Sequence, residues 1–459
     1  MILVQNLRLQ LNGSRILLLL FAGILIQSCG TSKKASRNNS GIPPTKSKPD
    51  VIVAKPKVDT VVWKNDKPKK DKIPTNANEE PAKPKPSTTI KKYVKEDSVF
   101  RIVSLLPLKS DEVDTTVSKI PSANIRFIHF YAGMKMAVEE VNYESGRKVI
   151  LDVFDTKSND VSISLLQKYD RTPPHLIIGP YKTDALKYAT DWAKNHETTL
   201  ISPWVSSSSI TEKNPYYVQI KAGLTAQYKM LNQHARNHYN VDNIILVSKS
   251  EDDSKYRYFN DTVQEAQKIV EKIIKEEDLA STQTNVLTPY FKTEGTTVFI
   301  LPLASIKDEN YIYHFLRRVS LEKGTKDVVV YGMHKWLELK PEITEYLNIQ
   351  KIRLSISNYV DNDNSEVRSF KKKYYNKYRE FPSEEALEGY DLMKYCIRSI
   401  RNYGVDFQNT NSSIISPGLQ SSFQLMPISK DKTKNQIDFY ENAFIKIIEV
   451  RNNKYRIVD

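Results

Sequence analysis

The sequence predicts an α/β protein with two lobes, each a mostly parallel sheet flanked by helices. From residue 100 onward, short runs rich in β-branched residues alternate with longer stretches of helical periodicity. This alternation occurs in two successive series, which indicates two lobes of the same class. About 360 residues follow a proline-rich N-terminal segment, which is enough chain for two lobes of ordinary size.

The first series predicts a parallel sheet with right-handed crossovers. Its strands are expected at 101–106, 149–154, 176–178 and 199–201. Its helices are expected at 126–142 and 183–195, with one more helix between them that ends near Tyr169. The second series predicts strands at 244–247, 298–301 and 328–331, with helices at 258–275, 310–321 and 341–347. The final segment, 442–458, alternates around Asn452 and Asn453, which is typical of a hairpin that closes the second lobe.

The N-terminus has the pattern of an export signal. Arg8 and Arg15 precede an apolar run at 16–26, which is too short to span a bilayer as a helix. The next residues, Ile-Gln-Ser-Cys at 26–29, resemble the lipobox of bacterial lipoproteins, although Gln27 stands where a small residue is usual. The resemblance implies that 1–28 is a removable signal peptide and that Cys29 carries acyl chains in the lipid bilayer.

Residues 29–97 are predicted to be a disordered tether rich in lysine and proline. Its two short apolar clusters, 51–53 and 61–63, are too small to bury, so docking motifs are the alternative. Residues 1–97 hold 19 Lys and Arg against 8 Asp and Glu, which leaves 49 against 46 in the remainder. The folded part is therefore nearly neutral, and no nucleic-acid partner is expected.

One set of residues carries a family resemblance: Phe130, Tyr131, Ala132, Gly133, Met136, Ala137, Val138, Asn142, Asp155, Thr156, Ile178, Gly179, Pro180, Ile201, Ser202, Pro203, Gly389, Tyr390 and Asp391. Their pattern resembles type I periplasmic binding proteins of the branched-chain amino acid group, and it spans most of residues 99–450. The resemblance implies three crossings between the lobes, expected at 218–221, 355–361 and 423–428. Lobe 1 would then comprise 98–220 and 356–425, with 370–403 inside it, and lobe 2 would comprise 221–355 and 426–459.

The resemblance also places ligand-contacting loops at the carboxyl ends of the strands. In the first lobe, Tyr181 and Thr183 belong to the loop that holds a ligand carboxylate, and Thr183 or Asp184 can cap the helix that follows. Lys182 is either a charge for an anionic ligand or merely solvated. Trp204 and Ser206 occupy the next loop, where Trp204 either stacks on a ligand or covers the core, and the serines 206–209 either donate to a ligand or form turns.

In the second lobe, Ser250 and Tyr256 follow a strand as the family's cleft loop does. His334 falls where amino-acid binders keep an acid for the ligand ammonium group. Without that acid, an α-amino acid loses its cationic partner unless a residue of the following loop replaces it. The candidates for that role are Glu251, Asp252 and Asp253.

No catalytic constellation is present in the sequence, so no enzyme activity and no cofactor are expected. His234 and His238 are spaced to bind a metal from one helix face, but no third ligand is evident, and a solvated helix end is the simpler interpretation. Cys396 lies on the apolar side of a predicted helix with Leu392, which favours a packed thiol over a nucleophile.

Two functions remain open. The first is a lipid-anchored solute-binding protein of a Gram-negative envelope that closes on a small polar ligand, such as an amino acid, for a membrane transporter of the ABC type. The second is a ligand-free scaffold or regulator that contacts the cell-wall synthesis machinery or another envelope protein, as outer-membrane lipoproteins with this fold do. The residues directly after Cys29 include no acid, which fits an anchor in the outer membrane with the protein facing the periplasm.

Overall fold

The computed structural model describes residues 99–112, 122–144, 146–157, 159–250, 256–260, 264–282, 285–410, 413–431, 436–451 and 454–458. The predicted signal peptide, Cys29 and the predicted tether lie outside these residues. Lys91–Asp459 form one compact unit. Within the described ranges, no helix has both the length and the apolar character needed to cross a membrane.

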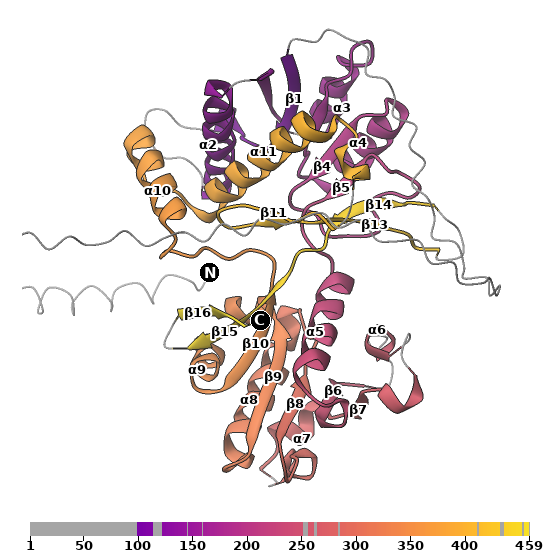
Figure 1. Ribbon diagram of the computed structural model, residues 1–459, viewed down its shortest axis with the longest axis vertical. Helices are drawn as coiled ribbons and strands as arrows, with labels where there is room; N and C mark the ends of the chain where they lie inside the picture. Colours follow the sequence, from indigo (N-terminus) through magenta and orange to yellow (C-terminus); the bar gives the residue numbers. More distant parts are fainter. Residues whose placement is uncertain are drawn as a thin grey trace, which may run out of the picture. The chain divides into compact units, whose positions relative to one another are not determined.

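The first lobe is built on a seven-stranded sheet in the order β13-β14-β5-β4-β3-β1-β2 (Figure 1). Its strands are β1 (Val99–Leu106), β2 (Lys148–Asp155), β3 (Leu176–Ile178), β4 (Thr199–Ser202), β5 (Tyr217–Gln219), β13 (Leu425–Ile428) and β14 (Phe439–Asn442). All neighbouring pairs are parallel except β13 with β14. The four predicted strands are confirmed, and three further strands extend the sheet.

Helices cover both faces of this first sheet. They are α2 (Ser122–Tyr143), α3 (Asn159–Gln167), α4 (Thr183–Asn195), α10 (Ser365–Tyr378) and α11 (Glu384–Tyr403). Successive residues of β1 point to opposite faces, so Ile102 packs with α2 and α11 while Val103 packs with α3 and α4. α10 packs on α2 and α11 through a separate cluster that includes Phe370 and Tyr374.

The second lobe has a seven-stranded sheet in the order β16-β15-β10-β9-β8-β6-β7. Its strands are β6 (Ile244–Ser248), β7 (Val270–Ile273), β8 (Thr296–Ile300), β9 (Asp327–Met333), β10 (Lys351–Ile356), β15 (Lys446–Arg451) and β16 (Lys454–Ile457). Strands β6 to β10 pair in parallel, whereas β15 and β16 are antiparallel. The predicted hairpin in 442–458 is therefore confirmed. A small two-stranded sheet, β11 (Ser416–Pro417) and β12 (Ser422–Phe423), lies apart from both main sheets.

The helices of the second lobe are α5 (Leu224–His238), α6 (Tyr256–Asn260), α7 (Glu276–Ala280), α8 (Glu309–Glu322) and α9 (Pro341–Ile349). The predicted helix at 258–275 is wrong, because α6 ends at Asn260 and β7 pairs with β6. The Asn260 side chain accepts the Ile269 backbone N–H at 2.8 Å and donates to the Ile269 carbonyl at 3.0 Å. These bonds hold the chain extended at the start of the strand.

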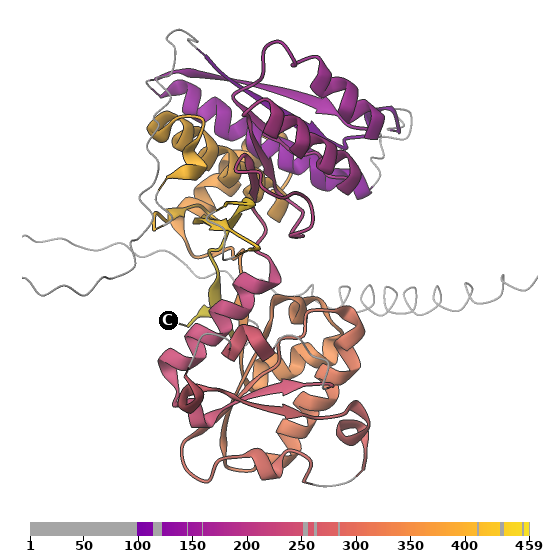
Figure 2. The ribbon, with the colours of Figure 1, turned by 90° about the vertical axis from the view of Figure 1, so that its right-hand side faces the viewer.

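The chain passes between the lobes three times. The first two passages follow β5 and β10, at the predicted positions 218–221 and 355–361. The third lies between Asn442 and Lys446, seen in yellow in Figures 1 and 2. The predicted crossing at 423–428, and with it the lobe boundary near 425, is wrong because β14 pairs in parallel with β5 and β13 pairs with β14.

Candidate functional site

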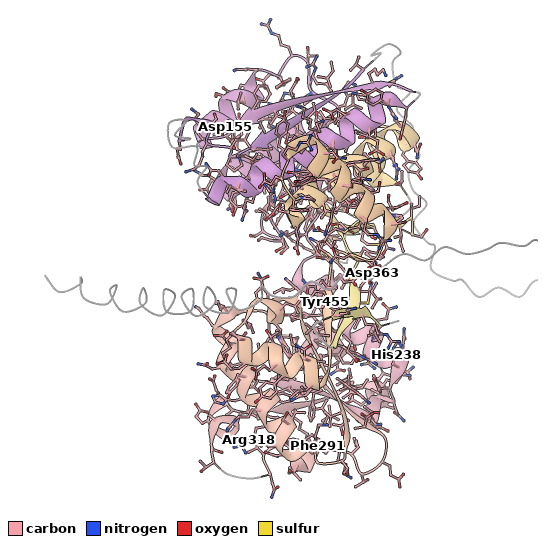
Figure 3. The ribbon with its side chains drawn as sticks, turned by 90° about the vertical axis from the view of Figure 1, so that its left-hand side faces the viewer. Asp155, His238, Phe291, Arg318, Asp363 and Tyr455 are labelled. Carbon is pink, nitrogen blue, oxygen red and sulfur yellow. The ribbon has the colours of Figure 1, made fainter. Side chains whose placement is uncertain are left out.

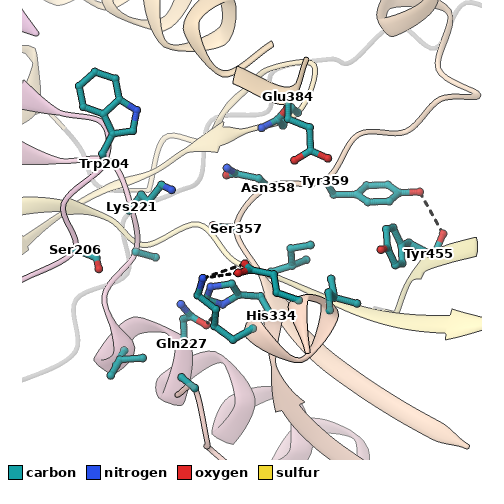
Figure 4. Close-up of a pocket in the computed structure, with 18 of the residues that line it drawn as sticks. Trp204, Ser206, Lys221, Gln227, His334, Ser357, Asn358, Tyr359, Glu384 and Tyr455 are labelled. Carbon is teal, nitrogen blue, oxygen red and sulfur yellow. Dashed lines mark hydrogen bonds and ion pairs between the residues drawn. The ribbon is translucent and has the colours of Figure 1, made fainter. Parts of the chain in front are cut away.

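A cavity of about 1010 Å³ is lined by residues of both lobes and of the first two crossings (Figure 4). Trp204, Ser206 and Glu384 line it from the first lobe, and Gln227 and His334 line it from the second. The crossings contribute Lys221, Asn358 and Tyr359. A volume of this size accommodates a small molecule together with water.

The first crossing fixes the position of Lys221. The Gly223 backbone N–H, at the N-terminus of α5, donates to the buried carboxylate of Glu441 on β14. The Gln219 side-chain amide donates to the Lys221 carbonyl at 3.1 Å. The backbone on both sides of Lys221 is therefore held, and its exposed side chain lines the cavity.

The second crossing is tied to the loop before β12. Asn358 forms an antiparallel bridge with Ser421, and the Tyr359 backbone N–H donates to the Gln420 carbonyl at 3.0 Å. The Tyr359 hydroxyl donates to the carbonyl of Tyr455 on β16 at 3.2 Å (Figure 4). These contacts hold Asn358, a partly buried amide, against the cavity.

His334 lies directly after β9, at the start of a 3₁₀ turn, His334–Glu338. Its Nδ1 is 3.1 Å from Oε1 of Gln227, which also accepts the Ser355 hydroxyl at 3.0 Å. Because an amide oxygen only accepts, Nδ1 carries the proton, which leaves the Nε2 lone pair free to accept. Burial, reinforced by Lys335, lowers the pKa of His334, so the ring is neutral at pH 7.

The charged groups that line the cavity differ in their pairing. Lys335 and Glu338 form an ion pair at 2.8 Å. Asp308 pairs with Lys249 at 3.0 Å. The side chains of Lys221 and Glu384 make no hydrogen bond or ion pair with any residue that the structure describes. The cavity therefore presents one uncommitted cation and one uncommitted carboxylate.

Glu388 lies one helical turn after Glu384 on α11. Burial raises the pKa of Glu388 to about 7, against the opposing charges of Lys221 and Arg126. Lys221 thus influences the protonation of Glu388 as well as that of His334.

An aromatic cluster occupies the ends of the first-lobe strands. The ring centroids of Trp204 lie 5.0 Å from Phe130, 5.4 Å from Phe127 and 5.7 Å from Tyr181. The Arg126 guanidinium lies over the rings of Phe127 and Tyr181, at 4.6 and 4.9 Å from their centroids. Trp204 packs against the first-lobe core and also lines the cavity, so the two interpretations of this residue are compatible.

The structure brings together only part of the predicted site. Trp204, Ser206 and His334 line the cavity, whereas Tyr181 belongs to the aromatic cluster. Thr183 is the exposed first residue of α4 and does not cap it, because the N-cap position belongs to Lys182, which makes no side-chain capping bond. Ser250 is exposed and does not line the cavity.

Several second-lobe candidates cannot be placed. Tyr256 begins α6, but its side chain lies outside the described residues, as do Glu251, Asp252 and Asp253.

In the serine loop of the first lobe, the hydroxyls of Ser207 and Ser209 form a hydrogen bond with each other at 2.8 Å. Their hydroxyls therefore stabilise the turn.

The cavity also contains residues that sequence reasoning did not select. Lys221, Asn358 and Tyr359 lie within two of the predicted crossings. Gln227 and Glu384 have no distinguishing motif. A polar residue inside a predicted crossing was the one available signal, because crossings in this architecture border the space between the lobes.

The two histidines of α5, Cys396 and Asp155 have structural roles. Asp155 is one of the residues that carry the family resemblance. His234 is buried, and its two ring nitrogens bond the Tyr331 hydroxyl at 2.8 Å and the Val458 carbonyl at 3.0 Å. It stacks on His238, with ring centroids 4.1 Å apart, and it is therefore not solvated. His238 (Figure 3) is the exposed last residue of α5, so the interpretation as a solvated helix end holds for that residue. Cys396 is fully buried beside Leu392, as predicted. Asp155, at the end of β2, accepts the backbone N–H groups of Lys109 and Ser110 at 2.8 and 2.7 Å (Figure 3).

Comparisons with known proteins identify the fold. No family model matches the sequence, and no curated protein matches it. A protein assigned to branched-chain amino acid ABC transport in Rhodospirillum rubrum has a similar structure, with a TM-score of 0.54 and 12% identity over 78% of this chain and 100% of that chain. The chain has the type I periplasmic binding protein fold.

LpoA of Haemophilus influenzae is also similar, with a TM-score of 0.50 and 12% identity over 82% of this chain and 61% of that chain. Both likenesses concern the fold. A fold hosts many functions, so the cavity has to be interpreted from its own residues.

Proposed function

We propose that this periplasmic binding protein fold serves as a solute-binding protein of the cell envelope, without enzymatic activity, that closes on a small polar ligand. The observation that carries the proposal is the pair of uncommitted charges, Lys221 and Glu384, in a cavity of about 1010 Å³. A ligand with an anionic and a cationic group, such as an amino acid or related metabolite, complements this pair.

The neutral groups of the cavity support the same ligand class. The Nε2 lone pair of His334 accepts a hydrogen bond from an ammonium group, and its neutral ring does not repel that charge. Asn358 donates or accepts, and Trp204 offers an apolar surface. His334 thereby replaces, as a neutral acceptor, the acid that is expected at its position in amino-acid binders.

The proposal includes the envelope location. Removal of residues 1–28 and acylation of Cys29 would anchor the protein in a membrane of a Gram-negative bacterium. The expected membrane is the outer one, with the folded part of the protein in the periplasm. The tether at 29–97 would then let the lobes reach a transporter or another envelope protein.

Thermal unfolding of Lys91–Asp459 against a library of amino acids, short peptides, organic acids and cell-wall fragments tests the proposal. A ligand that binds the native state raises the midpoint by mass action. Lys221→Ala and Glu384→Ala should each abolish the increase, because each removes one of the two uncommitted charges. Thr183→Ala, a hydroxyl outside the cavity, should retain it. An increase that survives both cavity substitutions would contradict this site.

A second candidate is a ligand-free envelope scaffold or regulator. The aromatic cluster of Trp204, Phe127 and Tyr181 favours it, because these rings occupy the strand ends where the family resemblance places ligand contacts. If the whole library leaves the midpoint unchanged, and Lys221→Ala fully complements a deletion of the gene in its own host, the scaffold function is preferred.

A further inference from the structure

Helix α10 concentrates positive charge on a nearly neutral lobe pair. From Ser365 to Arg379, six basic residues stand against one acid, Glu366: Arg368, Lys371, Lys372, Lys373, Lys377 and Arg379. Residues 98–459 together contain 49 basic and 46 acidic residues. This single helix therefore carries a larger positive excess than the whole of the folded part.

The basic residues are arranged by the way α10 packs. Val367, Phe370 and Tyr374 are buried against α2 and α11, which directs the opposite side of the helix to solvent. Arg368, Lys372 and Tyr375 follow one another at helical spacings of four and three residues, so they lie on this exposed side. Figure 1 shows α10 at the margin of the first lobe.

Exposed aromatic rings accompany the basic stripe. Tyr375 is 41% exposed and Phe381, just beyond the helix, is 75% exposed. Their ring centroids lie 5.0 Å apart. The two rings therefore form an exposed apolar pair directly beside the basic residues.

Two acids beside α10 are already paired. Glu139 on α2 pairs with Lys377, and Glu380 lies 3.2 Å from His129 on α2. The side chains of Lys372 and Arg379 make no hydrogen bond or ion pair with any residue in the described ranges. Their charges are therefore available to an anionic partner.

We propose that the stripe formed by Arg368, Lys372, Tyr375, Arg379 and Phe381 docks the folded part of the protein onto an anionic phospholipid bilayer. Each basic residue near such a surface is attracted by the negative potential of the anionic lipids. The rings of Tyr375 and Phe381 enter the interface, which a soluble polyanion would not require. This proposal is independent of the ligand in the cavity.

Vesicle co-sedimentation of Lys91–Asp459 tests it without the N-terminal segments. This unit contains the four described hydrophobic clusters in full, so it is expected to fold alone. It should bind vesicles of phosphatidylcholine with phosphatidylglycerol, release at high salt, and ignore vesicles of phosphatidylcholine alone. Absence of binding to the anionic vesicles overturns the proposal.

Charge reversal locates the surface. Lys372→Glu with Arg379→Glu should lower the partition coefficient at least about tenfold. The matched pair Lys187→Glu and Lys194→Glu, on the exposed side of α4, makes the same change in net charge elsewhere on the first lobe and should lower it less than about twofold. An equal loss in both pairs overturns the assignment to α10.

Phe381→Ser identifies the kind of partner. It should weaken binding to the anionic vesicles severalfold, with the circular dichroism spectrum and the unfolding midpoint unchanged, because the ring is exposed. If the partition coefficient stays at the wild-type value, the ring does not enter the bilayer and the vesicles act only as a polyanion, which overturns the assignment of this stripe as a membrane interface.

Discussion

The carboxylate of Asp391 on α11 accepts the backbone N–H of Ser421 at 2.9 Å, and Ser421 in turn bridges to Asn358 in the second crossing. The same carboxylate accepts the N–H groups of Leu419 and Gln420 at 2.8 and 2.7 Å. One buried side chain therefore shapes the loop against which the second crossing rests. Asp391 was part of the family-like motif, but its role is to position backbone and not to contact ligand.

Asp391→Ala should lower the free energy of unfolding by about 3 kcal/mol, because it leaves two buried backbone N–H groups and one partly buried N–H group without an acceptor. Urea denaturation of Lys91–Asp459 measures the change. Asp191→Ala, at an exposed position of α4, removes the same carboxylate and should change stability by less than about 0.5 kcal/mol. A similar midpoint for the two variants would show that the loop does not depend on Asp391.

Gly389→Ala should also destabilise the first lobe strongly. A Cβ atom at Gly389 would lie 2.1 Å from the Phe130 carbonyl oxygen, and one at Gly133 would lie 1.9 Å from the Ala386 oxygen. Helices α2 and α11 therefore cross backbone to backbone at these two glycines. We expect a loss of about 3 kcal/mol by urea denaturation, since a rigid backbone group must move. Glu385→Ala, on the same helix, serves as the control and should be nearly neutral.

The packing explains which parts of the fold the sequence predicted well. Strands such as Leu176–Ile178 are apolar on both faces and helices such as Thr183–Asn195 are long and amphipathic, so local pattern and tertiary environment agree. Residues 258–275 were wrongly predicted as a helix because their charged, periodic composition fits one. In the structure, Val270–Ile273 forms an edge strand because it pairs with β6. Pairing between distant segments is not visible in a single sequence.

The site was predicted only in part for a related reason. Trp204, Ser206 and His334 follow strand ends, which a sequence pattern can locate. Lys221, Asn358 and Glu384 reach the cavity through the crossings and the start of α11, whose placement depends on Glu441 and Ser421, residues more than 60 positions away along the chain. The third crossing was predicted at the wrong position because β14 pairs with β5, a strand that is far away along the chain.

Cys396 should resist alkylation in the native protein. It is fully buried, and burial raises the pKa of its thiol, which suppresses the reactive thiolate. Mass spectrometry of Lys91–Asp459 after iodoacetamide treatment at mildly alkaline pH should show no adduct, whereas the same treatment in guanidinium should label the thiol fully. Rapid labelling under native conditions would mean that α11 opens locally and often.

Glu388→Gln should stabilise the protein in a pH-dependent way. The pKa of Glu388 is raised by burial from 4.5 to about 7, so the folded state binds its proton more tightly than the unfolded state. The stability contributed by the protonated form is complete below about pH 4.5 and is lost as the pH rises through about 7. Glutamine mimics the neutral acid. The variant should therefore match the wild type in acid and exceed its unfolding midpoint above neutral pH. Glu345→Gln, at an exposed position of α9, should show no such divergence, and parallel pH profiles for Glu388→Gln and the wild type would contradict the raised pKa.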